Sequence, residues 1–402
     1  MKIRFLIANA YPSGGTIRTT INTANALARR GHKVEIISVY ASRRVPVFPV
    51  DPAVRLRSLD DRSEIGRAEA EKRTGSRARA VRLVKGLTER IPSRVIPRRD
   101  FRYPRFNLWT DIKLLRYLRT VNDGVIVGTR AGLNVAIAKH VNPHVVRVGQ
   151  EHLHLGVYAK VLRAEIAQTY PKLDAVVALT STDAKAYRKL IGKRTRVLQV
   201  PNAVPAIADV RSTCRNKVVI AAGRLSRQKG FDRLLDAWAV VAKEHPDWEL
   251  RIFGDGPLRD DLQGQIASLG IEETARLMGY TGKLAHEMAD ASIYAMASRF
   301  EGFPMVLLEA MKCGLPVVAF DFRNGPRDLI TPELDGLIVP NHDTQALGEA
   351  INRLIDDDQR RIEMGAAAVE KSRQFSVDQL AEQWEEIFTD LAVSKGHAYR
   401  RR

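Results

Sequence analysis

The chain has 402 residues, of which 45% are hydrophobic and 27% charged, and its formal net charge is +18. This length is too great for one compact core and predicts two domains. The two cysteines form no CxxC pair, so the sequence offers no disulfide framework and no cysteine metal site, as suits a reducing compartment. Apolar runs are strand-length, far short of the roughly 18 residues that span a bilayer, and we expect a cytoplasmic protein.

The N-terminal forty residues are typical of a strand, a glycine-containing loop, a helix and a second strand. The predicted bounds are 2–8, 16–30 and 33–39 for strand, helix and strand. Gly14 and Gly15 allow the loop to turn tightly and to approach a ligand closely. The complete GxGxxG pattern of dinucleotide-binding proteins is absent.

Residues 41–105 are basic and predicted to be irregular. They hold eighteen Lys and Arg against eight Asp and Glu, which is more than half of the chain's excess positive charge. Such a region attracts nucleic acid, anionic lipid or an anionic polymer, or it is a solvated surface insertion. Aromatic content is only 6% and no nucleic-acid-binding motif is visible, so nucleic acid is not expected as a partner.

Further strands and helices alternate along the rest of the chain. Strands are predicted at 124–128, 145–149, 175–179 and 197–200, and residues 201–205, with a proline at each end, are typical of a hinge. A second series has strands at 217–222, 249–253, 275–278, 292–297, 316–321 and 336–339, with helices that include 231–244 and 258–269. Residues 345–392 are predicted to be helical throughout, before a basic tail at 400–402. The alternation predicts two doubly wound parallel sheets.

Two glutamates, Glu301 and Glu309, lie eight positions apart across a loop-to-helix junction. Pro304 is a favourable first helical residue and Gly314 a favourable stop, which predicts a helix over 304–313. The open N–H groups at its start favour an anion such as phosphate. The segment therefore predicts a phosphate site with one carboxylate before it and one beyond it.

Loops at the carboxyl ends of the second series carry further polar and glycine residues. Gly223 and Arg224 follow the first strand and Lys229 precedes the next helix, a placement that suits neutralisation of a diphosphate. Gly254 follows the next strand, and Gly325-Pro326-Arg327-Asp328 follows a later one. Because carboxyl ends of parallel strands share one edge of a sheet, we expect these loops to form one site.

The segments GRLSRQKG, FGDGP, MASRFEGFPMVLLEAMKCGLPVVAFD and GPRDLI, within residues 216–345, resemble the family 4 retaining glycosyltransferases of the GT-B fold. The resemblance implies an α/β protein of two doubly wound Rossmann-like domains that face an interdomain cleft. The expected domains are 1–202 on the acceptor side, 203–375 for the nucleotide sugar, and a C-terminal helix within 376–402 that packs toward the first domain. The glycine loop GPRD is similar to versions in the branch that glycosylates polyol phosphates.

The same resemblance implies roles for the site residues. Glu301 would lie against the transferred sugar, Glu309 would bind the ribose hydroxyls, and the pair Arg224 and Lys229 would hold the diphosphate. Main-chain groups would complete the donor site at Gly14, Gly15, Gly223, Gly254, Phe303, Pro304, Met305 and Val306. His152, at the end of a strand, resembles the histidine that faces the donor sugar.

The implied reaction moves a hexosyl unit from a UDP- or GDP-sugar to a hydroxyl acceptor in cell-envelope glycan, glycopolymer or glycolipid synthesis. No metal is expected, because Arg224 and Lys229 and the helix start supply positive charge. His152 and His154 could suggest a metal pair, but a third ligand is not evident. The expected partners are the donor and an acceptor that is an anionic polymer or a lipid-linked glycan, with peripheral membrane association through residues 41–105.

Three other functions remain for comparison. A glycoside hydrolase also uses two carboxylates, but eight residues at ~1.5 Å per residue separate a helical pair by about 12 Å. Hydrolase carboxylates need roughly 5–9.5 Å, so this function is disfavoured. A nucleotide-sugar epimerase of the same fold, and a non-catalytic protein that binds anionic surfaces, stay as alternatives.

Overall fold

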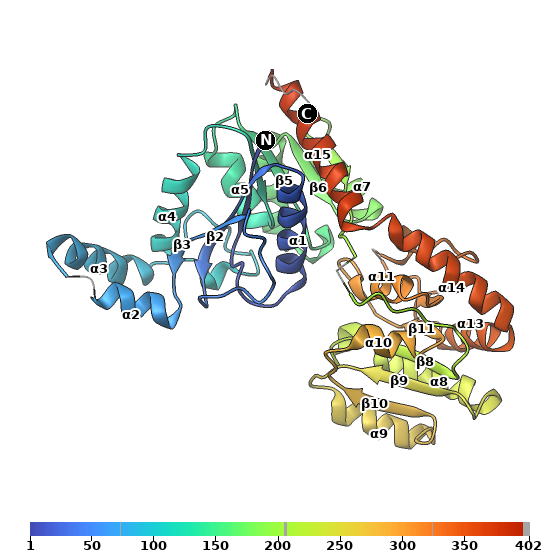
Figure 1. Cartoon of the computed structure of the whole chain (residues 1–402). Helices are drawn as coiled ribbons and strands as arrows, with labels where there is room; N and C mark the ends of the chain where they lie inside the picture. Colours follow the sequence, from blue (N-terminus) through green and yellow to red (C-terminus); the bar gives the residue numbers. More distant parts are fainter. Residues whose placement is uncertain (73, 205–206, 324, 397–402) are drawn as a thin grey trace. The chain divides into compact units, whose positions relative to one another are not determined.

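The computed structural model describes residues 1–72, 74–204, 207–323 and 325–396, and it divides into two compact units (Figure 1). Unit 1 holds the described residues of 1–203 and 377–396, and unit 2 holds those of 204–376. The boundary falls within the expected hinge at 201–205, of which Pro205 lies outside the described residues. The basic tail at 400–402 lies outside them as well.

Unit 1 is built on a parallel sheet with the strand order β3-β2-β1-β4-β5-β6-β7. Strand β1 is an inner strand and pairs in parallel with β2 and β4. The inner strands are almost continuous runs of buried apolar residues, because helices cover both faces of the sheet. The bounds are β1 Lys2–Ile7, β2 Lys33–Ala41, β3 Arg55–Asp61, β4 Val125–Gly128, β5 Val146–Gln150, β6 Ala175–Ala178 and β7 Arg196–Gln199.

Successive residues of β1 point to opposite faces of this sheet and enter different cores. Phe5 contributes to a core shared with α1 and with Trp384 and Phe388 of α15. Leu6 contributes to the other core, which α4, α5, α6 and α7 cover. The helices are α1 Gly15–Arg29, α2 Glu64–Lys72, α3 Ser76–Glu89, α4 Leu108–Leu118, α5 Ala131–His140, α6 Lys160–Thr169, α7 Ser181–Ile191 and α15 Val377–Ser394, with short 3₁₀ turns η1 Tyr103–Arg105, η2 Leu155–Val157 and η3 Tyr170–Lys172.

Unit 2 has a parallel sheet of its own with the order β10-β9-β8-β11-β12-β13. Its strands are β8 Val218–Ala222, β9 Glu249–Phe253, β10 Ala275–Gly279, β11 Ile293–Met296, β12 Val317–Phe320 and β13 Gly336–Val339. Helices α8 and α13 pack closely together, and the fully buried Trp238 of α8 donates a hydrogen bond to Thr274 Oγ1 over 3.1 Å. The helices are α8 Phe231–Glu244, α9 Arg259–Leu269, α10 Leu284–Ala289, α11 Met305–Lys312, α12 Pro326–Leu329, α13 Thr344–Asp356 and α14 Asp358–Arg373, with the 3₁₀ turn η4 Arg227–Lys229.

The prediction of two doubly wound parallel sheets is confirmed, and α8 and β9 have the predicted bounds. The prediction that residues 41–105 are irregular is wrong: β3 pairs in parallel with β2, and α2 and α3 follow it. Charged residues recur along β3 because it is the edge strand of the sheet, where one side of the strand stays accessible to water. The continuous helix predicted for 345–392 is also interrupted, since Asp357 accepts a hydrogen bond from Arg360 N and caps a new helix.

Within the described residues, no helix is both long enough and apolar enough to cross a membrane.

Candidate active site

Four loops of unit 2 follow the carboxyl ends of β8, β9, β11 and β12. The strand order β9-β8-β11-β12 brings these loops to neighbouring positions at one edge of the sheet, as the sequence predicts. Glycine makes their close approach possible. A Cβ atom at Gly254, whose φ is +140°, would lie 1.8 Å from the Gly223 carbonyl oxygen, and one at Gly230 would lie 2.1 Å from the Ala297 oxygen. Both positions therefore require glycine for the loops to pack together.

The loops after β8 and β9 form a cavity of about 340 Å³. Three of the predicted site residues line it, Gly223, Arg224 and Gly254. Arg224 is exposed, and its guanidinium has no hydrogen-bond or ion-pair partner among the described residues. The other lining residues are Ala222, Phe253, Asp255, Tyr280, Thr281 and Leu284. The cavity thus combines the glycine backbone of Gly223 and Gly254, which a ligand can approach closely, with the unpaired guanidinium of Arg224. The highly exposed ring of Tyr280 completes it.

Lys229 and Glu301 form an ion pair beside this cavity. Lys229 Nζ lies 2.7 Å from Glu301 Oε1, and Ser298 Oγ donates to the same oxygen over 2.9 Å. The aliphatic chain of Lys229 packs against Gly223, where an added Cβ would meet it at 3.0 Å. The carboxylate is buried, with 7% of the residue exposed, so its charge is held by specific donors rather than by water. The sequence places these two residues in one site but does not predict that they pair.

Helix α11 begins at Met305, and Pro304 is its N-cap residue rather than its first residue. Its first turn is less open than the sequence suggests. Met305 N donates to the Phe303 oxygen over 2.9 Å, and Leu307 N donates to the Pro304 oxygen over 3.1 Å. An anion at this end of the helix therefore meets fewer free N–H groups than an uncapped α-helix presents.

Glu309 lies on the second turn of α11 and is half-buried. Burial raises the pKa of Tyr294, and the nearby charges of Glu309 and Glu301 raise it further. Both carboxylates therefore lie near the buried Tyr294 ring, although they sit at different positions along the loop and helix. Beyond β12, Arg327 of α12 pairs with Asp321 over 2.6 Å and is occupied by that contact.

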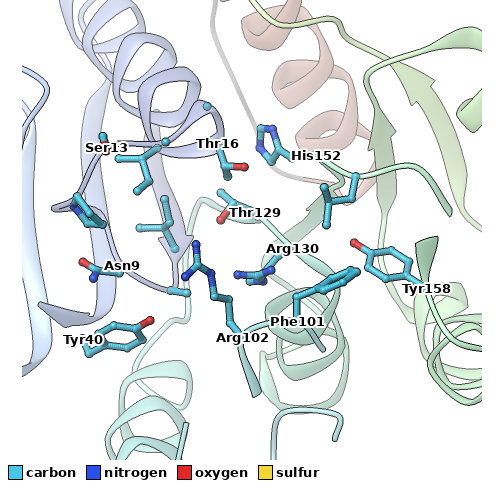
Figure 2. Close-up of a pocket in the computed structure, with 17 residues that line it drawn as sticks. Asn9, Ser13, Thr16, Tyr40, Phe101, Arg102, Thr129, Arg130, His152 and Tyr158 are labelled. Atoms are coloured by element: carbon cyan, nitrogen blue, oxygen red, sulfur yellow. The ribbon is translucent and has the colours of Figure 1, made fainter. Parts of the chain in front are cut away.

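Unit 1 has a cavity of its own, of about 430 Å³, at the carboxyl ends of β1, β4 and β5 (Figure 2). Gly14, Gly15 and His152 line it, so these three predicted residues come together. Gly14 is the N-cap of α1 and Gly15 its first residue. The remaining walls are Ile7, Ala8, Asn9, Pro12, Ser13, Thr16, Ile17, Tyr40, Phe101, Arg102, Thr129, Arg130, Leu153 and Tyr158.

His152 is a neutral imidazole at the wall of this cavity. Burial lowers the pKa of its ring to about 3, and the positive charge of Arg130 adds to the effect. Both ring nitrogens are shielded from solvent and have no hydrogen-bond partner among the described residues. At neutral pH the ring therefore adds no charge to the cavity.

The buried Glu151 anchors the chain just before His152. Its carboxylate accepts hydrogen bonds from the hydroxyls of Tyr158 and Tyr170 and from Asn134 Nδ2. Burial raises the pKa of this carboxyl to about 7, and these three donors limit the rise. The network fixes the end of β5, and with it the backbone of His152.

Sequence reasoning missed several residues of the two cavities. Arg130 could have been found because it lies two residues after β4, at the sheet edge where the other loops that line this cavity begin. Arg102 and Phe101 lay in the region predicted to be irregular, where no pattern singles them out. Tyr280 follows β10, a strand whose loop showed no motif. Among the described residues, no group of three or more His, Cys, Asp or Glu side chains is arranged to hold a metal ion.

Comparison with known proteins finds a family that resembles the second half of the chain. Residues 208–371, which include both the Lys229–Glu301 pair and the glycine-lined cavity, match the model of the glycosyl transferases group 1. This part of the chain is similar to that family. The two parallel sheets and their helices are those of the GT-B fold.

Individual relatives extend the similarity over almost the whole chain. An exopolysaccharide phosphotransferase of Streptomyces coelicolor is 35% identical over 394 residues, which are 97% of this chain, and the chain spans 41% of that relative's length. The amylovoran biosynthesis glycosyltransferase AmsD of Erwinia amylovora is 26% identical over 96% of this chain and 99% of its own length. The crystal structure of Anabaena HepE in complex with UDP has a TM-score of 0.72 at 19% identity, covering 97% of this chain and 100% of its own.

Proposed function

We propose that this chain is a retaining hexosyltransferase that moves a sugar from a UDP- or GDP-sugar to a hydroxyl acceptor in cell-envelope glycan, glycopolymer or glycolipid synthesis. The observation that carries the proposal is the unpaired Arg224 in a glycine-lined cavity with Lys229 alongside. The exopolysaccharide and amylovoran relatives support an envelope glycan as the product, and the UDP complex of a GT-B neighbour supports a nucleotide donor.

In this proposal each unit 2 residue has a separate role. Arg224 and Lys229 bind the diphosphate, Glu309 binds the ribose hydroxyls and Glu301 contacts the sugar. Main-chain groups of Gly223, Gly254 and the segment from Phe303 to Val306 border the donor. We assign Gly14, Gly15 and His152 of unit 1 to the handling of the sugar and the acceptor. Glu301 holds Lys229 in the free protein, so the donor phosphate must share or take over that ammonium.

The proposed step breaks the bond between the anomeric carbon and the β-phosphate oxygen. The acceptor oxygen bonds to the anomeric carbon from the same face, and its proton passes to the departing phosphate oxygen. Negative charge therefore develops on the diphosphate, where a guanidinium and an ammonium stabilise it in place of a metal ion. Retention follows from attack on the face that the leaving group occupies.

Substitution of Arg224 tests this assignment. Arg224→Ala should lower transfer about 10²-fold or more, because one preorganised charge at a developing oxyanion is worth that much in comparable sites. Donor consumption and glycoside formation should be followed together by mass spectrometry, with UDP- and GDP-hexoses as donors. Arg215→Ala is the matched control, since Arg215 is also exposed but precedes the amino end of β8.

Wild-type transfer by Arg224→Ala, with Arg215→Ala also active, contradicts the proposed diphosphate clamp. A donor converted to an isomeric nucleotide sugar, with no glycoside formed, would instead identify an epimerase. Retained transfer after exhaustive treatment with EDTA is expected, and loss of transfer that Mg²⁺ or Mn²⁺ restores contradicts the metal-independent step.

We also propose that α3 docks the protein on an anionic membrane, at the cytoplasmic face. Ala80, Leu83 and Leu87 share one face of the helix, opposite Lys85, which contacts Asp60 of β3 over 3.7 Å. Leu83 and Leu87 are 67% and 61% exposed, and the basic residues Arg79 and Arg90 flank them. An apolar stripe bordered by cations fits an interface of acyl chains and acidic headgroups.

A further inference from the structure

We propose that the unit 1 cavity binds a phosphoryl group of the acceptor through Arg102 and Arg130. This inference rests on the proposed transferase function, which requires an acceptor, and it names the chemistry by which that acceptor is recognised. The two arginines come from different segments, Arg102 from the turn before η1 and Arg130 from the residue that precedes α5. In Figure 2 both guanidinium groups point into the cavity.

The walls of the cavity carry an excess of positive charge. Arg102 and Arg130 line it, and Asp and Glu are absent from the described residues that form its walls. The His152 ring is neutral and adds no charge of either sign. An anion in this cavity therefore meets cations without a competing carboxylate at the surface.

Asp100 lies behind the walls and is already engaged by the backbone. Its Oδ2 accepts a hydrogen bond from Gly132 N over 3.0 Å, and its Oδ1 accepts one from Arg102 N over 2.8 Å. Arg130 Nε lies 3.5 Å from the same Oδ1. This one buried carboxylate thus fixes both the start of α5 and the turn that holds Arg102. A single carboxylate cannot neutralise both guanidinium groups.

The Arg102 guanidinium is exposed and has no hydrogen-bond or ion-pair partner within the described parts of the chain. Arg130 is more enclosed, with 18% of its side chain exposed. One arginine at the mouth and one deeper inside suit a tetrahedral phosphoryl group, whose several oxygens can accept from two guanidinium forks at once.

The remaining walls suit the uncharged part of such an acceptor. The ring centroids of Phe101 and Tyr158 lie 6.2 Å apart, and both residues line the cavity. Their rings offer apolar surface to a polyol, a sugar or a prenyl chain. The His152 ring forms an uncharged part of the wall. A volume of about 430 Å³ accommodates a phosphoryl group together with one such neighbour.

The decisive experiment is a binding titration of the full chain without donor. Glycerol 1-phosphate, glycerol, glucuronate and geranyl diphosphate should be compared by calorimetry in low salt. We expect glycerol 1-phosphate to bind at least tenfold more tightly than glycerol or glucuronate, and Arg102→Ala to weaken it at least tenfold. Arg194→Ala is the matched control, because Arg194 is exposed and lies between α7 and β7, outside the cavity.

Arg130→Lys serves as a second variant, because it keeps the charge beside Asp100 and removes the fork. It should weaken phosphate binding while thermal unfolding stays unchanged. Tighter binding of geranyl diphosphate assigns the phosphoryl group to a lipid carrier, and tighter binding of glycerol 1-phosphate assigns it to a polyol chain. Equal binding of glycerol and glycerol 1-phosphate, or equal binding by wild type and both variants, overturns the proposal.

A transfer assay separates this inference from the proposed function. Equal transfer to phosphorylated and unphosphorylated acceptors by the wild type overturns the phosphoryl site and leaves the transferase assignment intact. Arginine-dependent phosphate binding without transfer from any donor retains the phosphoryl site and overturns the transferase assignment.

Discussion

Just after β5, the buried Glu151 and the half-buried His152 are adjacent, and their pKa values shift in opposite directions. The pKa of Glu151 is raised and the pKa of His152 is lowered. The His152 ring has a folded pKa of about 3, so it stays neutral while the unfolded chain binds a proton below about pH 6.5. Stability is therefore lost as the pH falls from about 6.5 toward 3. The Glu151 carboxyl, with a pKa of about 7, gains stability as the pH falls from 7 toward 4.5.

Replacement of His152 separates the two effects. Between pH 7.5 and pH 5.0 the neutral ring costs the wild type about 2 kcal/mol of unfolding free energy, and His152→Gln should remove that cost. Urea unfolding at both pH values measures the difference, and Glu151 cancels because it is present in both proteins. His144→Gln, at an exposed position, is the control. An equal pH dependence in wild type and His152→Gln contradicts the buried neutral ring.

The proposed ribose contact at Glu309 gives a second prediction. Glu309→Ala should raise the donor KM about tenfold with little change in kcat, because the lost contact is present in both ground and transition states. Initial rates over a range of donor concentrations measure this separation. A fall in kcat at unchanged KM would assign Glu309 to the chemical step instead.

Residues of the candidate site can be proposed from the sequence where a local motif singles them out, as for Arg224 and Glu301. Their interactions could not be predicted. Lys229 and Glu301 are 72 positions apart, and their pairing depends on the neighbouring positions of β8 and β11. Arg102 and Arg130 lie at the same cavity because one buried carboxylate, Asp100, ties both of their backbone segments together. That arrangement has no signature in the linear sequence.

At the level of the elements, the proposed membrane docking of α3 can be tested directly. Leu83→Asp with Leu87→Asp should abolish co-sedimentation with phosphatidylglycerol vesicles, since it removes exposed apolar area and adds repelling charge. Val161→Asp, at a 69% exposed position on α6, controls for a general effect of surface charge. Binding by the double variant that equals wild type, at low and at physiological salt, would show that α3 is solvated surface.

The elements themselves follow from the sequence to different degrees. Strands such as β8, in which all five residues are buried, stand out as short apolar runs between polar loops. Strand β3 was missed because its sequence RLRSLDD lacks such a run. It forms as an edge strand by pairing with β2, and most of its side chains stay exposed or half-buried. Tertiary context therefore decides β3, whereas local composition decides β8.

For the whole molecule, the division into two units predicts two separable stabilities. Trp384 of α15 is buried in unit 1 and Trp238 of α8 in unit 2, so the chain offers a matched pair of substitutions. Trp384→Ala and Trp238→Ala should each cost about 3–5 kcal/mol. Differential scanning calorimetry should show that each variant shifts a different unfolding transition. A single transition shifted equally by both would show that the units unfold as one.

The Lys229–Glu301 contact has a consequence for the end of the catalytic cycle. Any diphosphate that binds Lys229 does so in competition with a carboxylate 2.7 Å away, which is tethered and cannot diffuse off. The Lys229–Glu301 ion pair must be weakened when the nucleoside diphosphate product binds, and this lowers the affinity for the product. Once the sugar has left, Glu301 can reclaim the ammonium and help to expel the nucleoside diphosphate. On the proposed reaction, weak product inhibition is thus a property of the resting site.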